Sequence, residues 1–459
     1  MAEVKPFAGT RYQFKDEAGD AGPLLCPPPD LVSESLRAEL HAQHEHNLVR
    51  LVSGEEAASD DDSSNRFSRA AELYRDWKHR GILADDQRKC LYVYEMEYKL
   101  PGARKAVKRR GFIALVKLQD YRSGKIRSHE ETLPSRKEEQ LRLLKACEVN
   151  LIPPFMLYRD EEDAVGKILD DAMVNEKTKE PLAPTLEAKD HFGHTHRLWA
   201  VHKKDAILAV HEALKMKRLY ILDGHDVYDA ALMYRDQRRE ASGRRDGQQP
   251  SDWMMMFLYN ADREHLNISS FHRVLARELG SDVDINEVLE DLREFYTVSP
   301  FKYDTDDPKK GVKAVQEKFE TAAADRTHFV MALPNGRAYL LTLRKDVNLT
   351  DMIEEETMSD MLKNIDVTML HYYVITRGWI GNPEVELGED DVHYTTDTAE
   401  ALGLLKRRKG SVAFLVRPLS VEQILAVAEN GELLPARSTF LLPKLACGMV
   451  LRDQNVGFS

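Results

Sequence analysis

The spacing of apolar residues along the chain predicts strands that alternate with helices. Short apolar runs rich in β-branched and aromatic residues predict buried strands over 91–98, 111–118 and 253–259. Apolar residues at helical spacing predict a helix over 66–80, where a glycine follows as a stop signal. This alternation is typical of a mixed α/β architecture, which is the fold class we predict.

One stretch, RLYILDGHDVYDAAL over 218–232, combines a strand, a sharp turn and a helix start. An apolar run over 219–222 predicts the strand, and helical spacing resumes at about Tyr228. Gly224 can adopt backbone angles that other residues avoid. The N–H groups at such a helix start favour an anion, commonly a phosphate. We therefore expect a phosphate-binding turn flanked by Asp223 and His225; the alternative is an ordinary strand–turn–helix connection without a ligand.

The remaining pattern predicts irregular segments and a more helical C-terminal part. Basic residues predict a loop over 104–110, and polar residues predict a second loop over 239–250. Helical spacing over 274–279 begins the helical part, in which the segments 329–333 and 338–343 predict a hairpin. We expect three sections: an N-terminal α/β region over 1–125, a core over 126–265, and a mostly helical α/β lobe over 266–459.

Composition places the chain among soluble globular proteins. It has 459 residues, 42% hydrophobic and 31% charged, with no apolar run long enough to cross a bilayer and no apolar signal core at its start. The four cysteines are widely scattered, which predicts reduced thiols in a cytoplasmic protein. A net charge of −12 argues against broad binding to nucleic-acid backbones, although it leaves room for a local basic pocket.

The first candidate for chemistry is Glu130, which sits beside His129 in a predicted loop. A carboxylate in such a place can act as a general base towards a hydroxyl group. An ordinary surface His-Glu pair is the simpler interpretation, because such dipeptides are common.

Pairs of basic residues are the second candidate, namely Arg109-Arg110, His196-Arg197 and His272-Arg273. Each pair alone is typical of a charged surface. Together they would supply the donors that phosphate oxygens bind strongly. The chain has no Walker A pattern, no protein-kinase signature and no Gly-x-Gly-x-x-Gly. Any phosphate-binding site must therefore be built from other residues.

Two histidine clusters share the spacing His-x-x-His-x-His and start at His41 and His191. Histidine is the commonest metal ligand, so metal binding has to be weighed. In the second cluster, His194 and His196 would share one face of a strand. No carboxylate or thiol completes a known metal motif at this spacing, so the sequence favours ordinary histidines.

The motifs taken in order resemble a large bacterial and archaeal family of unknown function that has been related to ParB. The resemblance runs nearly end to end. The matching residues are Lys5, Pro6, Phe7, Gly9, Arg11 and Tyr12; Asn47, Arg50 and Leu51; 109–112; His129, Glu130, Thr132, Leu133 and Pro134; Asn150; 196–199; His272 and Arg273; and Arg437, Ser438, Thr439, Pro443 and Lys444.

The middle motif of this family is similar to one in the ParB/sulfiredoxin superfamily, which includes free-serine kinases. The resemblance implies a ParB/sulfiredoxin-like core with a smaller C-terminal lobe, and phosphoryl transfer to L-serine from ATP, ADP or pyrophosphate with Mg²⁺. Glu130 and His225 would be catalytic, and Asp223 would hold the metal as well as the phosphates. The other implied cofactor contacts are Gly224, His129, Arg110, His196, Arg197, His272 and Arg273.

The chain departs from the family motif Asp-Gly-His-His-Arg, because Asp226-Val227 replaces its last two residues. Valine cannot bond phosphate, and an added carboxylate repels it unless a metal intervenes. A catalytically silent protein that binds a nucleotide or phosphate is therefore the alternative to a kinase. DNA binding by analogy with ParB is a weaker third reading, given the acidic charge. We expect a small-molecule substrate, and neither a membrane nor a nucleic acid as partner.

Overall fold

The computed structural model describes residues 2–13, 21–100, 103–276, 285–322, 326–347, 358–375, 391–407 and 411–456. Contacts between Cα atoms divide the chain into two units. Unit 1 comprises Met1–Ser128, Thr132–Asn267 and Pro443–Ser459, and unit 2 comprises His129–Glu131 and Ile268–Leu442. Both contain helices and sheets, which confirms the mixed α/β class. The division into three sections stays a prediction.

Unit 1 is built on a nine-stranded sheet, counted over the described residues. Its strands follow the order β6 (Ile126–Arg127), β11 (Leu219–Asp223), β8 (Phe155–Tyr158), β12 (Trp253–Asn260), β5 (Val107–Lys117), β4 (Leu91–Tyr98), β10 (Thr195–Val201) and β9 (Leu186–Lys189), and β1 (Val4–Lys5) also pairs with β5. Small ladders join β2 (Thr10–Tyr12) to β3 (Leu83–Asp85) and β7 (Val149–Asn150) to β21 (Arg452–Asp453).

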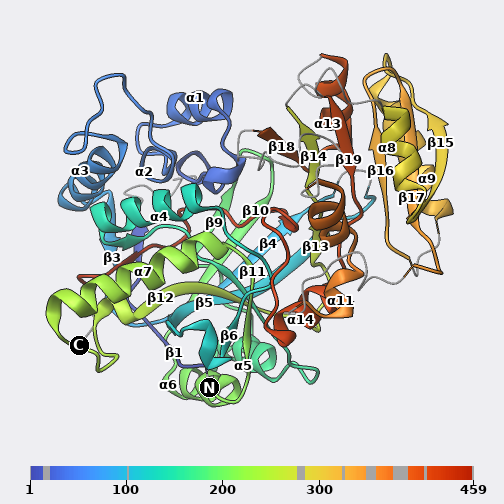
Figure 1. The fold of residues 1–459 in the computed structure, drawn as a ribbon. Helices are drawn as coiled ribbons and strands as arrows, with labels where there is room; N and C mark the ends of the chain where they lie inside the picture. Colours follow the sequence, from blue (N-terminus) through green and yellow to red (C-terminus); the bar gives the residue numbers. More distant parts are fainter. Residues whose placement is uncertain are drawn as a thin grey trace. The chain divides into compact units, whose positions relative to one another are not determined.

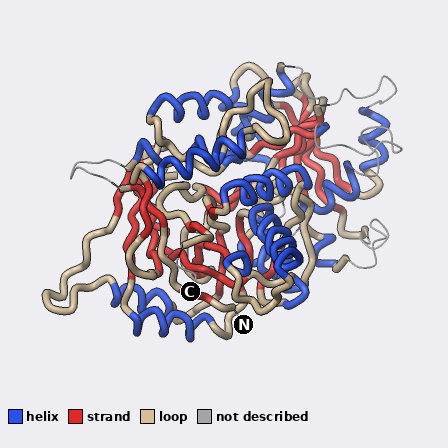
Figure 2. Tube along the Cα trace, turned by 90° about the vertical axis from the view of Figure 1, so that its left-hand side faces the viewer, coloured by secondary structure: helices blue, strands red, loops and turns tan. Residues whose placement is uncertain are grey.

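Strand β12 is buried along its whole length, which explains the unbroken apolar run in its sequence. Met254, Met256 and Leu258 alternate into one core cluster, which helices of unit 1 cover. Helices (blue) flank the strands (red) in Figure 2, and α4 runs beside α7 in Figure 1. The helices are α1 (Glu34–Gln43), α2 (Val49–Val52), α3 (Arg66–His79), α4 (Pro134–Cys147), α5 (Ala164–Ala172), α6 (Lys204–Leu214) and α7 (His225–Ser242).

Unit 2 has a six-stranded sheet within the described ranges. The order is β15 (Tyr296–Lys302), β17 (Arg337–Leu343), β16 (His328–Ala332), β19 (Val412–Leu415), β14 (His272–Leu275) and β18 (Val392–Thr395). The predicted hairpin is confirmed as β16 and β17. The short β13 (Asn267–Ser269) pairs with β20 (Phe440–Leu442).

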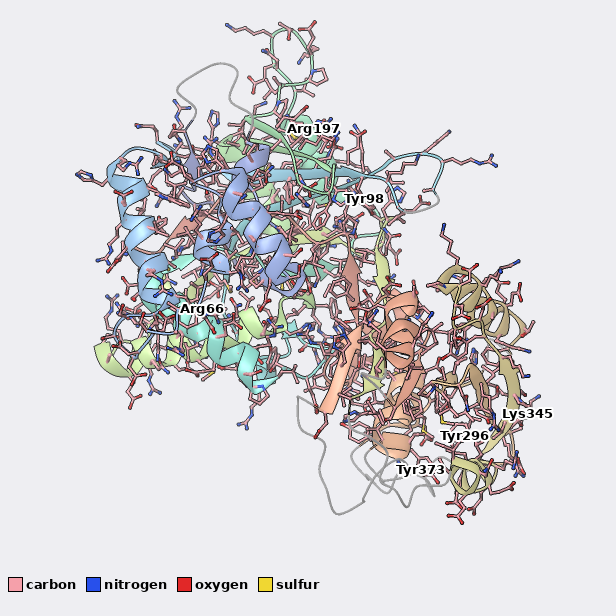
Figure 3. All side chains as sticks on the ribbon, turned by 90° about the horizontal axis from the view of Figure 1, so that it is seen from above. Arg66, Tyr98, Arg197, Tyr296, Lys345 and Tyr373 are labelled. Carbon is pink, nitrogen blue, oxygen red and sulfur yellow. The ribbon has the colours of Figure 1, made fainter. Side chains whose placement is uncertain are left out.

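Two cores lie on the two faces of the sheet in unit 2, because side chains alternate along each strand. In β17, Leu341 and Leu343 join one core, while Leu340 joins the other. Tyr296 and Tyr373, labelled in Figure 3, belong to the first core. The helical elements are α8 (Ile285–Leu292), α9 (Pro308–Thr321), α11 (Asp360–Lys363), α12 (Asp366–Thr368), the π-helix Met369–Ile375, α13 (Thr398–Lys406) and α14 (Val421–Asn430).

Three predicted segments are wrong, and each error has a physical cause. The expected basic loop over 104–110 is partly strand β5, because Lys108 and Arg110 lie opposite Glu97 and Glu95 of β4. The expected helix over 274–279 begins as strand β14, which hydrogen-bonds to strands on both sides; 277–279 lie outside the described residues.

The third error concerns the polar segment 239–250, because helix α7 continues through Ser242. Straight-chain charged residues extend a helix well without apolar contacts, and Gly243, with φ of 68°, ends it. All four cysteines are buried free thiols, as predicted. None of the helices within the described ranges is long and apolar enough to span a bilayer.

Candidate functional site

The turn after strand β11 requires glycine. Gly224 caps helix α7 with φ of 82°, in the left-handed region. A Cβ atom added there would also lie 3.1 Å from the Cα of Pro154. Helix α7 begins at His225, three residues before the predicted start, so His225, Asp226 and Val227 form its first turn. The turn thus presents the backbone N–H groups of a helix start, as the sequence predicted.

A buried lysine neutralises part of the charge at this turn. The ammonium group of Lys444 lies 2.9 Å from Asp30 Oδ2 and also donates a hydrogen bond to Asp223 Oδ1. Only 4% of the Lys444 side chain is exposed. Its two carboxylates raise the pKa of Lys444 even though burial lowers it, so the lysine stays charged. Sequence reasoning gave Lys444 no role, although the motif at the end of the chain includes it.

Asp226 adds a third carboxyl group to this cluster. Burial, together with the negative charges of Asp223 and Asp30, raises the pKa of Asp226 to about 6. Three carboxylates against the positive charges of Lys444 and Arg109 leave excess negative charge, which opposes a bound phosphate unless a cation accompanies it. The departure from the family motif at Asp226 therefore weakens phosphate binding at the turn unless a cation is bound there too.

Arg109, rather than Arg110, interacts electrostatically with Asp223 at the turn. Successive side chains of a strand point to opposite faces, so these two neighbours of β5 diverge. Arg109 is buried, hydrogen-bonds to the carbonyl oxygen of Pro443, and is close enough for the charge of Asp223 to affect its pKa.

Arg110 and Arg197, both expected to bind phosphate, are engaged by carboxylates of the sheet. Arg110 Nε donates to Glu95 Oε2 at 2.8 Å, and Arg197 Nη1 donates to Glu95 Oε1 at 3.2 Å. Arg197, labelled in Figure 3, also bonds to Glu97 at 2.8 Å and to Glu187 at 2.7 Å. A phosphate would have to displace these carboxylates, so the ion pairs on the sheet compete with the predicted phosphate-binding role of Arg110 and Arg197.

Glu130 forms a second centre, within unit 2. Its carboxylate accepts hydrogen bonds from the backbone N–H groups of Arg437 at 3.0 Å and Thr439 at 2.8 Å, and from the Thr439 hydroxyl at 2.7 Å. Burial outweighs these bonds and raises the pKa of Glu130 to about 7. Because the Thr439 proton goes to Glu130, the hydroxyl oxygen accepts from His129 Nε2 at 3.0 Å.

The backbone beside Glu130 is held in an unusual conformation. Arg437 has φ of 60°, a region that non-glycine residues rarely occupy. Its N–H is bound by Glu130, and its carbonyl oxygen accepts from Arg273 Nη2 at 3.3 Å. Contacts on both sides hold such strain in place, and strained residues concentrate at functional sites. Pattern analysis has no signal for this feature, because it depends on contacts far apart in the sequence.

Of the pair in strand β14, only Arg273 faces Glu130. Arg273 is fully buried, and the charge of Glu130 acts on its pKa. His272 instead accepts from the Val416 N–H through Nδ1 at 3.3 Å, so its Nε2 donates to Thr398 Oγ1 at 2.8 Å. Burial lowers the pKa of His272 to about 4, which keeps it neutral. The predicted residues thus group as His129, Glu130 and Arg273 in unit 2, and as Asp223, Gly224 and His225 in unit 1.

Comparison with curated protein sequences gives no match. Among solved structures, a free serine kinase in complex with AMP has a TM-score of 0.35 and 12% identity, covering 75% of this chain and 93% of that one. A conserved hypothetical protein from Pyrococcus furiosus has a TM-score of 0.34 and 11% identity, covering 75% and 97%. SbnI from Staphylococcus aureus, truncated at its C-terminus, has a TM-score of 0.33 and 12% identity, covering 74% and 87%.

A family model matches residues 4–368, which is most of the chain. The matched range includes Glu130 and the turn at Gly224, whereas Thr439 and Lys444 lie beyond it. The chain therefore belongs to the family described as protein of unknown function, DUF1015.

Proposed function

We propose that the protein is a phosphotransferase that moves a phosphoryl group from a nucleotide or pyrophosphate to the hydroxyl group of a small molecule, with L-serine as the first acceptor to test. The observation that carries the proposal is Glu130, a buried carboxyl group whose pKa is raised to about 7. A general base works best when its pKa lies near the working pH. The motif resemblance, including the relationship to the ParB/sulfiredoxin superfamily and to free-serine kinases, supports the same assignment.

The turn at Gly224 supplies the other half of the proposal. Backbone N–H groups at the start of α7 and the charged Lys444 are the groups that phosphate oxygens bind. In phosphoryl transfer the protein mainly positions the reactants and stabilises charge. Glu130 would take the proton of the acceptor hydroxyl group, while the turn holds the donor phosphates.

Mg²⁺ fits the chemistry of this turn in part. Asp30, Asp223 and Asp226 offer the oxygen ligands that Mg²⁺ prefers, and their excess negative charge favours a cation. Lys444 already bonds to two of them, so these carboxylates do not form a ready cage. Mg²⁺ usually reaches such sites with substrate phosphates and keeps several waters. Asp223 and Asp226 would hold it there, where it would neutralise phosphate charge.

The test is a ³¹P NMR assay of the full chain with Mg²⁺ and L-serine, comparing ATP, ADP and pyrophosphate. We expect a phosphoserine signal from one donor, reduced at least about a hundredfold in Glu130→Gln, as expected for loss of a general base. Glu131→Gln is the matched control, because this neighbouring side chain is exposed. Full activity in Glu130→Gln would remove Glu130 as the base.

A silent binding protein is the second candidate, and Asp226-Val227 favours it. If no donor gives a product, ligand protection decides between the two functions. Slower hydrogen exchange at the start of α7 with ADP or pyrophosphate, without turnover, would indicate binding alone. The double variant Asp226→His, Val227→Arg restores the family motif and would recover turnover only in a phosphotransferase whose activity this departure had removed.

A further inference from the structure

Three side chains of unit 1 converge at the start of strand β10, and one of them, His196, is among the cofactor contacts that the resemblance implies. Among the described residues, Asp190, His194 and His196 form the one group of three whose metal-ligand atoms all lie within 4.8 Å of one another. Asp190 Oδ2 lies 3.0 Å from His196 Nε2 and 3.3 Å from His194 Nδ1. The proposed phosphotransferase reaction gives Asp190 and His194 no role.

A tight hairpin between β9 and β10 builds the cluster. The Gly193 N–H donates to the carbonyl oxygen of Asp190 at 3.0 Å, and Gly193 has φ of 81°, which suits glycine. The His194 N–H donates to Asp190 Oδ1 at 2.8 Å, so one carboxylate oxygen fixes the turn and the other faces the imidazoles. His194 lies one residue before β10 and His196 is the second residue of that strand, and both imidazoles contact Asp190. The signal that pattern analysis missed is Asp190, four residues before His194.

The contact between His196 and Asp190 is close and buried. His196 is fully buried, and its Nε2 lies 3.0 Å from Asp190 Oδ2. A ring nitrogen this close to a carboxylate oxygen can share a metal ion with it when the ring proton is on the other nitrogen, because metal binding requires neutral histidine and ionised carboxylate.

We propose that Asp190, His194 and His196 bind one divalent transition-metal ion, with zinc as the preferred ion. Zinc bonds to histidine and carboxylate ligands are about 2.0–2.2 Å long, so neighbouring ligands in a tetrahedron lie about 3.3–3.6 Å apart. The separations of 3.0 and 3.3 Å are close to this spacing. The side chains of Asp190 and His194 are 12% and 19% exposed, so water can fill a fourth position.

The outer contacts of His196 suit a metal ligand. Binding through Nε2 requires the ring proton on Nδ1, and Tyr94 Oη lies 2.7 Å from that nitrogen. Tyr94 Oη also accepts from the Ala446 N–H at 3.2 Å, which fixes the oxygen in place. Metal-ligating histidines usually donate their second ring N–H to an oxygen atom, most often of a carboxylate, a backbone carbonyl group or a water molecule, and Tyr94 would take that place here.

Metal content of the full chain tests the proposal. The protein, made without a histidine tag, is stripped with a chelator, incubated with Zn²⁺ or Co²⁺, and desalted. We expect one ion per chain by mass spectrometry of the metal, and a visible Co²⁺ absorption band. Asp190→Asn and His194→Gln should each lower the affinity at least about tenfold, and Tyr94→Phe should lower it about tenfold to a hundredfold.

The matched control is His191→Gln, in the same hairpin. His191 Nε2 lies 3.5 Å from Glu39 and outside the cluster, so this variant should keep the ion. Circular dichroism checks that each variant is folded. The proposal is overturned if neither Zn²⁺ nor Co²⁺ binds the folded wild-type chain stoichiometrically, or if the bound ion survives both Asp190→Asn and His194→Gln.

Discussion

The raised pKa of Glu130 predicts that part of the stability of unit 2 is lost as the pH rises. The carboxyl group has an ordinary pKa of 4.5 in the unfolded chain and a pKa of about 7 in the folded one. Between these values the folded protein binds a proton that the unfolded chain has released. The free energy of unfolding therefore falls with rising pH, and the contribution is complete below pH 4.5 and gone above about pH 7.

The magnitude follows from the width of this interval. Each pH unit changes the free energy by about 1.4 kcal/mol, so an interval of about 2.5 units gives about 3 kcal/mol. Glu130 is only 9% exposed, so solvent screening reduces this figure little. His272 works in the opposite direction in the same unit, because burial lowers its pKa from 6.5 to about 4. The stability of the wild type alone therefore hides both contributions.

The assay compares wild type with Glu130→Gln, which is neutral at every pH. Hydrogen exchange of peptides that include Arg437 and Thr439 reports local stability, since both N–H groups bond to Glu130. We expect the wild type to lose about 3 kcal/mol relative to the variant between pH 4.5 and 7. Glu422→Gln, an exposed carboxyl group on α14, should give a flat difference. A difference for Glu130→Gln that changes by less than about 0.5 kcal/mol would refute the raised pKa.

Three further predictions concern single residues. Lys444→Met should lower the free energy of unfolding in urea by about 3–5 kcal/mol, because two carboxylates lose the buried ammonium group that neutralises them. Lys215→Met breaks an exposed ion pair and should lower it by less than about 1 kcal/mol. Equal losses would contradict the importance of the buried ion pairs of Lys444. Gly224→Ala should lower the free energy of unfolding by at least about 1 kcal/mol more than Gly243→Ala does. Both glycines have a positive φ, but only at Gly224 would the added Cβ atom also contact Pro154. Similar losses would show that this contact is unimportant. The stability of the wild type relative to His272→Gln, measured by urea unfolding at each pH, should fall as the pH is lowered from 6.5 to about 4. A constant difference between the two proteins would contradict the lowered pKa of His272.

The sequence predicted what depends on local pattern and failed where distant partners decide. Strand β4 begins and ends at the predicted residues, because most of its residues are apolar or aromatic and buried. Helix α3 ends one residue early at His79. The first residues of β5 were assigned to a loop, because their basic character becomes compatible with a strand only opposite the acidic residues of β4.

For the candidate site residues too, the sequence predicted local features and missed contacts between distant residues. The sequence placed Asp223, Gly224 and His225 on one turn, because strand, glycine and helix are local signals. It named Arg110 rather than Arg109 as a cofactor contact, because a choice between neighbours on a strand requires knowing which face of the sheet each side chain takes. It also could not find Lys444 or Thr439 as partners, since each lies more than 200 residues from the carboxylate it contacts.

The short segment from Arg437 to Lys444 gives the two candidate centres a common dependence on the end of the chain. In unit 2, the backbone and hydroxyl group of Thr439 bind Glu130. In unit 1, Lys444 neutralises Asp223 and Asp30, and Pro443 accepts from Arg109. Each of these contacts pairs a polar or charged group of one centre with this segment, and the loss of a partner at a desolvated charge is costly in a folded protein. A chain that ends before Arg437 would retain the entire family match yet leave Glu130 and Asp223 without these partners. Retained proton uptake by Glu130 near pH 7 in such a truncated chain would show that burial alone, rather than this segment, sets its chemistry.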